Sequence, residues 1–277
     1  MGSDDLFYVD QKPIPTCFTK CNFNPGQPIN FKVSHIYDPS KFWIVVKFQE
    51  LEIFQKHLFQ YYYLNRNKYK MPTDNLQLDM PCVAFTDGNY YRGRIVGLPQ
   101  DLWDQNQVHV FFTDYGSLQL VDYNNIFYMS VKHCEVPQFS VRASLAQVRP
   151  KNSHCQWTVA DVTEFSNLLS DKVLAGVVEN VYREREVVEV ACRERGVGAA
   201  VHDTLVAQQR TQYRDEELKS GKKMPPPEPK YFCAHVCPSH EAIESGKVPT
   251  SLSDAEFQVM VAPFSPIVTR YYQVKDA

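Results

Sequence analysis

The chain has 277 residues, of which 44% are apolar, so it is long enough for one large domain or two small ones. Its net charge of −3 shows no general excess of Lys and Arg, which phosphate-binding proteins usually carry, although the totals leave a local basic patch open. No run approaches the roughly 18 apolar residues of a membrane span. The eight Cys are dispersed and follow no secretory signal, which predicts reduced thiols in the cytoplasm or nucleus. The start Met1-Gly2-Ser3 looks artificial, so we expect a piece of a longer protein.

The first element that we predict is a β-hairpin over Ile29–Phe48, after an irregular leader that ends at residue 27. Phe31 begins an alternating apolar pattern, and Asp38-Pro39-Ser40 has the composition of a turn. The run Phe42–Val46 is β-branched and aromatic, which is typical of a buried strand.

A helix is predicted from about Glu50, because apolar residues then recur at spacings of three and four, at Leu51, Phe54, Leu58 and Tyr61. We assign the three tyrosines Tyr61–Tyr63 to the packing of this helix. The stretch Asn65–Gln77 is polar and contains Pro72, so we predict a loop there.

Short strands separated by turns are predicted between Met80 and Met129, and this pattern indicates a small β-barrel. Asp87-Gly88 and Gly116 mark two of the turns, where free backbone rotation is useful. The four predicted strands are Cys82–Phe85, Tyr90–Val96, Val108–Phe112 and Leu118–Val121.

The second half of the chain is predicted to alternate strands with short helices. Thr158, followed three residues later by Asp161, has the pattern of a helix cap. Predicted strands lie at Val141–Val148, Val173–Tyr182 and Glu186–Cys192, and a last short element lies at Val201–Ala207. The charged, Pro-rich run Gln208–Lys230 predicts a linker, and the tail beyond it regains apolar residues and either packs back or begins another module.

The sequence has no Gly-rich phosphate loop, no G-x-S-x-G elbow and no H-E-x-x-H motif, so we expect no catalytic constellation. The nearest pattern to a metal site is Cys233–His240, to which Cys17 and Cys21 could add two ligands. Structural zinc sites usually pair a short Cys loop with a distant second pair, so we expect ordinary thiols, no metal and no cofactor.

Aromatic residues crowd near two of the predicted turns, at Phe85, Tyr91, Phe112 and Tyr115. Tyr90, next to Tyr91, is predicted to point to the opposite face of its strand. Strand ends of a small barrel meet at one rim, so several ring faces could wall one pocket. Rings around a cation gain cation–π energy, and a methylated arginine keeps its charge while it loses donors. The alternative is that these rings form part of the barrel core, as aromatics in small barrels commonly do.

The run Cys82–Ile95, followed by Val108–Ser117, resembles the core of Tudor domains: C-x-A-x-F, then W/Y-Y-R-A-x-V, then V-x-F-x-D-Y-G-N. Pro137–Pro150 and Val201–Val206 resemble later segments of extended Tudor domains. The resemblance covers about residues 28–210 and implies a mostly β fold with a few helices, in which a small Tudor barrel is inserted in a staphylococcal-nuclease-like, OB-type barrel. The implied division is 1–27 leader, 28–78 first part of the nuclease-like barrel with its linking helix, 79–135 Tudor core, 136–210 second part of that barrel, and 211–277 linker and tail.

By position, the family's four cage aromatics fall on Phe85, Tyr91, Phe112 and Tyr115. The polar residue after D-Y-G, usually Asn, orients the guanidinium in the family, and here it is Ser117. Ser is shorter and has no amide, so the resemblance implies a weakened polar clamp with the ring stacking retained.

Arg92 and Asp114 lie beside ring positions, and we expect them to form a structural ion pair that supports the cage loops. The turn at Asp38 matches the nuclease-type metal site but has one carboxylate and no following acidic partner, so we expect an inactive scaffold without nuclease activity.

The resemblance implies a peptide-binding adaptor, not an enzyme, that recognises methylarginine in Arg-Gly or Arg-Ala tails of Piwi-clade Argonautes or another germ-granule protein. Such adaptors act in cytoplasmic, perinuclear germ granules in transposon silencing by Piwi-interacting RNA. The tail Val261–Ile267 resembles the region after the Tudor domain of Spindle-E type helicases, so the parent could carry an RNA helicase. Two alternatives stay open, namely a single-stranded RNA-binding module and a scaffold whose degenerate cage binds nothing and whose protein partner binds elsewhere.

Overall fold

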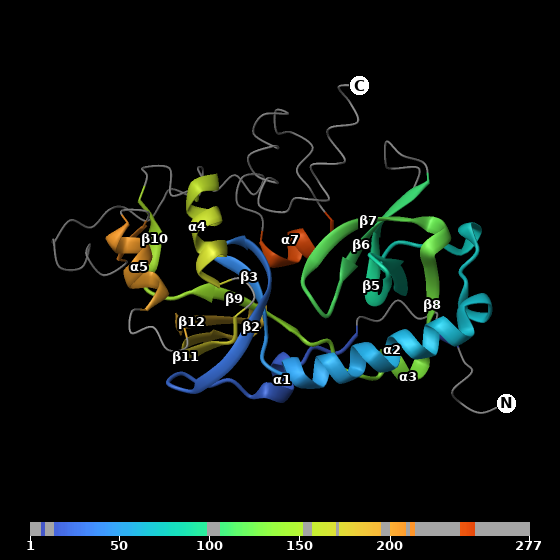
Figure 1. Ribbon diagram of the computed structural model, residues 1–277, viewed down its shortest axis with the longest axis horizontal. Coiled ribbons are helices and arrows are strands. Elements are labelled where there is room, and N and C mark those ends of the chain that lie inside the picture. The colour runs from blue at the N-terminus through green and yellow to red at the C-terminus, as the bar shows by residue number, and fades with distance from the viewer. Residues whose placement is uncertain are drawn as a thin grey trace, which may run out of the picture. The chain divides into compact units, whose positions relative to one another are not determined.

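The structure, a computed structural model, describes residues 7–8, 14–98, 106–151, 157–169, 172–194, 200–208, 211–213 and 239–246 (Figure 1). Most of the predicted linker and tail, including Cys233 and the run Val261–Ile267, lies outside these residues. The described residues fall into two compact units. Among them, unit 1 draws on 7–8, 14–21, 45–98, 106–140 and 243–246, and unit 2 draws on 22–44, 141–151, 157–169, 172–194, 200–208, 211–213 and 239–242.

Unit 1 is built on a six-stranded antiparallel sheet in the order β1-β8-β4-β5-β6-β7. Alternate residues of its strands meet in one apolar cluster that includes Ala84, Ile95 and Val110. A flat sheet could not bring side chains of so many strands together, so the sheet curls around this core as the predicted small barrel does. Its strands are β1 (Phe7–Tyr8), β4 (Pro81–Thr86), β5 (Asn89–Gly97), β6 (Gln107–Phe112), β7 (Ser117–Asp122) and β8 (Ile126–Ser130).

The outer side of this sheet is covered by helix α2 (Phe48–Tyr69), which packs against β5 and β8. Leu58, Tyr62 and Tyr69 are fully buried and pack with residues of the sheet such as Phe127. Of the predicted stripe, Leu51 and Leu58 are buried, and Phe54 and Tyr61 are partly buried against the same cluster. The assignment of the tyrosines to packing is correct for Tyr61 and Tyr62 but wrong for Tyr63, which is 68% exposed.

Helix α2 also runs past the predicted start of a loop at Asn65. Asn65 itself has non-helical angles, and its side-chain amide donates to the Tyr61 carbonyl over 2.9 Å, which supports a kink at this point. The helix resumes because burial of Tyr69 outweighs the polar composition of the stretch. The remaining short helices of unit 1 are α1 (Phe18–Cys21), η2 (Thr73–Asn75), η4 (Tyr123–Asn125) and α3 (Val131–Cys134).

The close approach of β5 and β6 depends on Gly93. A Cβ on this residue would lie 2.4 Å from Val110 Cγ1 and 2.9 Å from the Phe111 carbonyl oxygen. Gly93 stands at the Ala position of the Y-R-A pattern. The absence of a Cβ at residue 93 leaves space for the Val110 side chain.

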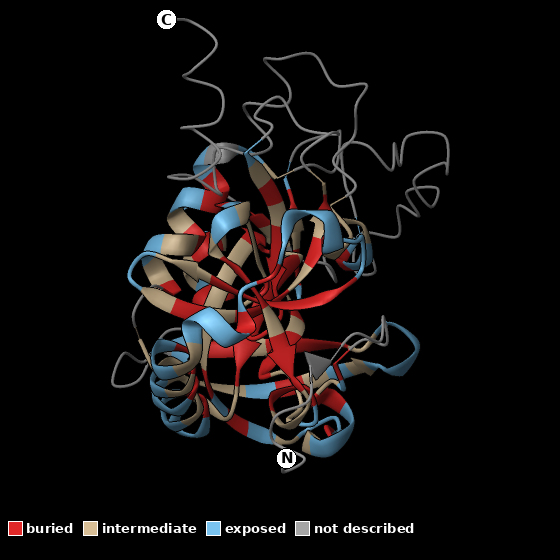
Figure 2. Ribbon diagram, turned by 90° about the vertical axis from the view of Figure 1, so that its right-hand side faces the viewer, coloured by how far each residue is buried: buried red, intermediate tan, exposed pale blue. Residues whose placement is uncertain are grey.

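Unit 2 contains a closed barrel in the order β11-β12-β9-β3-β2. Its core includes Phe31, Phe42 and Val190, and the ring of Phe42 meets that of Phe165 edge to face at 5.3 Å. Figure 2 shows that burial concentrates on the strands, whereas the helices are exposed along one side. The barrel strands are β2 (Pro28–Asp38), β3 (Lys41–Val45), β9 (Ser140–Leu145), β11 (Leu174–Tyr182) and β12 (Val187–Glu194).

The predicted helix after Thr158 is α4 (Val159–Leu169), and its predicted cap is confirmed. The Thr158 N–H donates to Asp161 over 2.9 Å, and the Asp161 N–H donates to the Thr158 hydroxyl over 3.2 Å. The last predicted element, Val201–Ala207, is helix α5. The other short elements are η5 (Arg183–Arg185) and α7 (His240–Glu244).

Three predicted boundaries differ from the structure. The leader is not wholly irregular, because Phe18 of α1 and Phe23 are buried. The strand predicted at Val141–Val148 breaks at Gln147, whose φ of 67° ends β9 before β10 (Val148–Pro150) begins. The predicted linker starts later, because β13 (Thr211–Tyr213) pairs with β10.

Candidate functional site

The hairpin of β4 and β5 sorts its aromatic residues onto two faces. Phe85 pairs with Tyr90 across the hairpin, and Ala84 pairs with Tyr91. Side chains alternate between faces along a strand, and directly paired residues share a face. Tyr91 therefore points to the side of Ala84 and the barrel core, whereas Phe85 points to the opposite side with Tyr90.

Three of the four predicted cage rings come together on the Tyr91 side. The Tyr91 ring lies 5.5 Å from that of Phe112 at an interplanar angle of 66°, and 5.5 Å from that of Tyr115 at 85°. Phe112 is 2% exposed, while Tyr91 and Tyr115 are half-buried. The arrangement is a corner of near-perpendicular rings with Tyr91 as the shared wall.

Both hydroxyls of this corner stay protonated at physiological pH. Burial raises the pKa of Tyr115, and the nearby carboxylates of Asp114 and Glu52 add to the effect. Burial also raises the pKa of Tyr91, with a further contribution from Asp87. Neutral rings keep their electron-rich faces, which are the part of the ring that attracts cations.

Phe85 does not join these rings, and its predicted place in the cage is wrong. Its ring lies 4.7 Å from that of Tyr90, in the cluster beneath α2, and the Arg66 guanidinium lies 5.5 Å from its centroid. The physical reason is spacing. The pattern C-x-A-x-F has its ring four residues after Cys, whereas Phe85 comes three residues after Cys82 and so falls on the other face.

Ser117 stands next to the ring corner. It pairs with Phe112 in the β6–β7 hairpin, so both side chains point to the same face. Gly116, with a φ of 79°, makes the turn that leads into this position. The predicted clamp position is therefore beside the rings, with a short hydroxyl in place of an amide.

A polar group from α2, which the sequence patterns do not predict, borders the corner. Gln55 accepts a hydrogen bond from the Tyr115 hydroxyl over 3.4 Å and donates to the Asn89 side chain over 3.1 Å. Asn89 is the first residue of β5 and precedes Tyr91 by two residues. Gln55 therefore links Tyr115, in the β6–β7 turn, to Asn89, at the start of β5.

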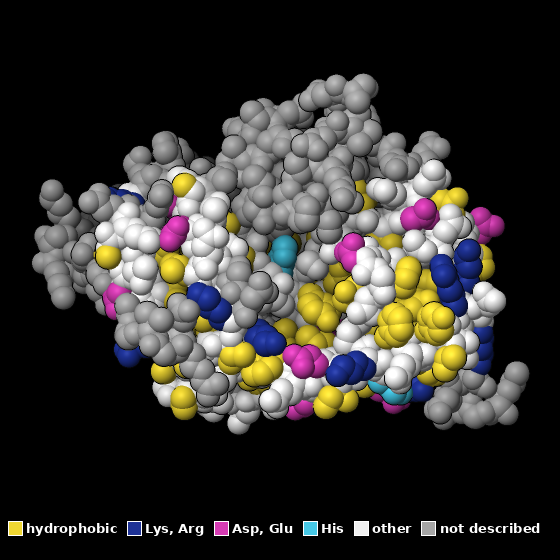
Figure 3. Space-filling view, viewed as in Figure 1, with side chains coloured by type: hydrophobic (Ala, Val, Ile, Leu, Met, Phe, Trp, Pro, Cys, Tyr) yellow, Lys and Arg dark blue, Asp and Glu magenta, His cyan; other side chains and the backbone are white. Residues whose placement is uncertain are grey.

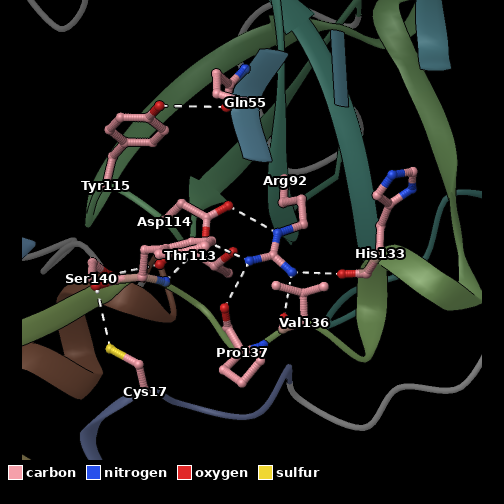
Figure 4. Close-up of polar contacts among 11 residues, drawn as sticks. Cys17, Gln55, Arg92, Thr113, Asp114, Tyr115, His133, Val136, Pro137 and Ser140 are labelled. Atoms are coloured by element: carbon pink, nitrogen blue, oxygen red, sulfur yellow. Dashed lines mark hydrogen bonds and ion pairs between the residues drawn. The ribbon is translucent and has the colours of Figure 1, made fainter. Parts of the chain in front are cut away.

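Arg92 and Asp114 form the buried frame on which the ring loops rest (Figure 4). Arg92 is 0% exposed, and its Nε and Nη2 donate to the two Asp114 oxygens over 2.9 and 2.6 Å. Its remaining donors reach the carbonyls of His133, Val136 and Pro137 over 2.6, 2.5 and 3.1 Å. All five guanidinium N–H donors are therefore used, as the predicted structural role requires.

The same frame extends beyond the ion pair. The Phe139 N–H donates to Asp114 Oδ1 over 3.0 Å, and the Arg92 guanidinium lies 4.4 Å from the centre of the Phe54 ring. The Ser140 hydroxyl donates to the Thr113 carbonyl over 2.7 Å, which holds the β6–β7 turn that carries Tyr115. Because all of its N–H donors are used within the protein, Arg92 supports the structure of the site and does not bind a ligand.

Asp38, the one carboxylate of the nuclease-type turn, is buried and already paired in unit 2. It accepts from the Ser40 N–H over 2.6 Å and lies 2.8 Å from Lys41 Nζ. Within the described ranges no group of three or more His, Cys, Asp or Glu side chains has the arrangement of a metal site. His240, the one member of the Cys233–His240 pattern that is described, packs its ring 5.1 Å from that of Trp43. Among the helices of the described ranges, none has the length and apolar character needed to cross a membrane.

Comparison with known proteins identifies the sequence relatives of this chain. A family model described as the Tudor domain matches residues 23–147. Human Tudor domain-containing protein 1 is 25% identical over 202 residues, which cover 70% of this chain and 15% of that protein. Zebrafish Tudor domain-containing 6 is 24% identical over 192 residues, which cover 66% of this chain and 8% of that protein. The chain therefore spans a small part of the length of these relatives.

Solved structures show the same fold. The human TDRD1 extended Tudor domain, in complex with a symmetrically dimethylated peptide, matches 75% of this chain and 100% of its own with a TM-score of 0.61 and 19% identity. An extended Tudor domain of mouse TDRD1, bound to a MILI peptide that contains dimethylarginine, matches 69% of this chain and 96% of its own with a TM-score of 0.58 and 20% identity. The Drosophila melanogaster Papi extended Tudor domain, in complex with an unmethylated Piwi N-terminal peptide, matches 68% and 99% with a TM-score of 0.58 and 18% identity. Residues 23–147 thus match the Tudor domain model, and the chain has the mostly β fold of an extended Tudor domain, in which the Tudor sheet is accompanied by a nuclease-like barrel.

Proposed function

We propose that the ring corner of Tyr91, Phe112 and Tyr115 binds an arginine side chain of a partner peptide. The observation that carries this proposal is that the Phe112 and Tyr115 rings both lie 5.5 Å from the Tyr91 ring, at interplanar angles of 66° and 85°. A guanidinium in such a corner meets ring faces on more than one side, and each contact contributes about 0.5–2 kcal/mol.

Acidic residues around the corner favour a cation over a neutral ligand. Asp87 in the β4–β5 turn acts electrostatically on Tyr91, and Glu52 of α2 acts on Tyr115. Both carboxylates are exposed, so their attraction is long-range and reduced by salt. Binding of a positively charged peptide should therefore weaken moderately as ionic strength rises.

Methylation should strengthen binding because the rings of the corner offer apolar surface to the added methyl groups. A methylated guanidinium keeps its charge, has fewer donors to satisfy and adds methyl contacts with the rings. Three rings in place of four, and Ser117 in place of Asn, imply a smaller gain from methylation than a complete cage would give.

The proposed partner is a tail with Arg-Gly or Arg-Ala repeats, such as that of a Piwi-clade Argonaute, in cytoplasmic germ granules where Piwi-interacting RNA silences transposons. Support comes from the related solved structures, two of which hold MILI and Piwi peptides. In this proposal the chain is a binding module and not an enzyme, because Asp38 is committed to Ser40 and Lys41. A Spindle-E type helicase as the parent protein belongs to the same proposal.

Calorimetry with an Arg-Gly repeat peptide tests the site directly. Unmethylated and symmetrically dimethylated forms should both bind, with the dimethylated form the tighter. Tyr115→Ala should weaken binding about 2- to 30-fold, which corresponds to one lost cation–π wall.

Tyr182→Ala is the matched control, because Tyr182 is 45% exposed and belongs to unit 2. This variant should bind the peptide with the same affinity as the unaltered chain. If Tyr115→Ala and Tyr182→Ala bind the dimethylated peptide equally well, the peptide lies elsewhere and the scaffold reading replaces this proposal.

A further inference from the structure

Helix α2 from Ile53 onward and the residues that follow it carry a local concentration of positive charge. Residues 53–73 contain four Lys and Arg residues and no Asp or Glu, in a chain whose net charge is −3. The four are exposed on the surface, at Lys56, Arg66, Lys68 and Lys70. The charge balance of the whole chain conceals this patch.

Aromatic rings lie among these charges. The rings of Phe59 and Tyr63, one helical turn apart, are nearly parallel, with centroids 5.8 Å apart and an interplanar angle of 13°. Tyr63 is 68% exposed, so its ring faces solvent and does not fill the core. Lys56, Phe59, Tyr63 and Arg66 follow one another at spacings of three, four and three, which places them along one side of the helix.

The strand beside the helix extends this row of rings. Phe85, which falls on the α2 side of the β4–β5 hairpin, lies under the Arg66 guanidinium at 5.5 Å. Figure 3 shows hydrophobic and Lys or Arg side chains next to one another near this end of α2. The aromatic and basic residues Lys56, Phe59, Tyr63, Arg66 and Phe85 are called the α2 surface below.

We propose that the α2 surface binds single-stranded nucleic acid, by stacking bases on Tyr63 and Phe59 and by pairing phosphates with the basic side chains. Exposed rings among Lys and Arg are the combination that non-sequence-specific single-strand binders use. An acidic peptide would match the charge but not the rings, because the electron-rich face of an aromatic ring repels a carboxylate. A duplex would match the charge but keeps its bases stacked within the helix.

This site is separate from the proposed arginine site, since its rings lie on the other side of the β4–β5 hairpin from Tyr91. The two activities should therefore be lost independently. Tyr63→Ala should leave the affinity for the arginine peptide unchanged, and Tyr115→Ala should leave the affinity for nucleic acid unchanged.

Fluorescence anisotropy with a labelled uridine oligonucleotide of about 12 nucleotides, a length within the range that small single-strand binding domains cover, provides the test. A thymidine oligonucleotide of the same length should bind similarly, because stacking and phosphate contacts do not require the 2′-hydroxyl. The plot of log affinity against log salt should have a slope of about −1.4, since each of the two phosphate contacts, made by Lys56 and Arg66, contributes about −0.7.

Three variants locate the binding. Tyr63→Ala should weaken binding at least about fivefold, the lower end of the loss expected for one stacked base. Arg66→Gln should reduce the salt slope by about 0.7. Leu64→Ala is the control for an exposed apolar neighbour, since Leu64 is 79% exposed and has no ring, and it should bind as the unaltered chain does.

The proposal is overturned if the oligonucleotide does not bind, or if a duplex of the same length binds as tightly as the single strand. It is also overturned if Tyr63→Ala and Leu64→Ala have the same affinity as the unaltered chain, or if a poly-glutamate peptide displaces the oligonucleotide at equal charge concentration.

Discussion

The two faces of the β4–β5 hairpin carry different kinds of aromatic cluster. On one face Tyr91 meets Phe112 and Tyr115 beside the exposed carboxylates of Asp87 and Glu52. On the other face Phe85 and Tyr90 pack beneath α2, where the exposed charges are basic. Because neighbouring residues of a strand point in opposite directions, the position of one ring relative to Cys82 decides which cluster it joins. Ring content alone therefore does not define a cage.

The largest expected effect comes from breaking the frame that both faces share. Asp114→Asn leaves the Arg92 guanidinium buried without its carboxylate, so the free energy of unfolding should fall by about 3–5 kcal/mol. Urea unfolding followed by circular dichroism measures this loss.

The surface ion pair of Arg94 and Asp79, with atoms 3.1 Å apart and side chains 26% and 61% exposed, is the control. Asp79→Asn should cost less than about 1 kcal/mol, because exposed pairs contribute little. Equal losses for the two variants would show that Arg92 and Asp114 are not the frame of the site.

The hairpin shows why the sequence predicts the fold and part of the site, but not all of it. The strands, both turns and the grouping of Tyr91, Phe112 and Tyr115 follow from alternation and spacing within a short stretch. Phe85 could have been placed by counting from Cys82 through the two-residue turn at Asp87 and Gly88, which fixes the pairing register.

Gln55 could not have been found by such counting. It lies 60 residues before Tyr115, and only the packing of α2 on the sheet brings the two together. The extension of α2 to Tyr69 likewise depends on a buried contact that local composition opposes. Sequence patterns within one hairpin are therefore informative, whereas contacts between a helix and a sheet require the fold.

Restoring a ring to the cage face should increase affinity for an arginine peptide. Thr86 lies two residues after Ala84 on the same strand, so Thr86→Phe places an aromatic ring on the Tyr91 side, four residues after Cys82. The dimethylated peptide should bind about 2- to 30-fold more tightly, as expected for one added cation–π contact. Calorimetry measures the gain, and an unchanged affinity would mean that the added ring does not reach the ligand.

A smaller gain is expected from the polar position opposite Phe112. Ser117→Asn supplies an amide that can accept from a guanidinium N–H, and part of the gain is lost in ordering the longer side chain. We expect at most about a tenfold increase in affinity for the dimethylated peptide. Ser117→Thr keeps the hydroxyl and is the control. If both variants bind alike, an amide at this position does not act as a clamp.

The smallest effect on peptide binding should come from Phe85 itself. Phe85→Ala removes a ring from the α2 side, so the affinity for the arginine peptide should stay within about twofold, a difference of roughly 0.4 kcal/mol. The same variant should weaken oligonucleotide binding, which the anisotropy assay measures in parallel. A loss of peptide affinity as large as that of Tyr115→Ala would show that Phe85 does belong to the arginine-binding cage.

The contact between Gly93 and Val110 has a consequence for how this domain can diverge. With 2.4 Å between the position of a Cβ on residue 93 and Val110 Cγ1, Ala at 93 is compatible with the sheet only when residue 110 is smaller than Val or has moved. The two sites should therefore change together in viable descendants. Gly93→Ala should be destabilising alone and only partly rescued by Val110→Ala, because the Phe111 carbonyl oxygen, 2.9 Å away, must also shift. A mutational library that varies them one at a time would discard combinations that fold.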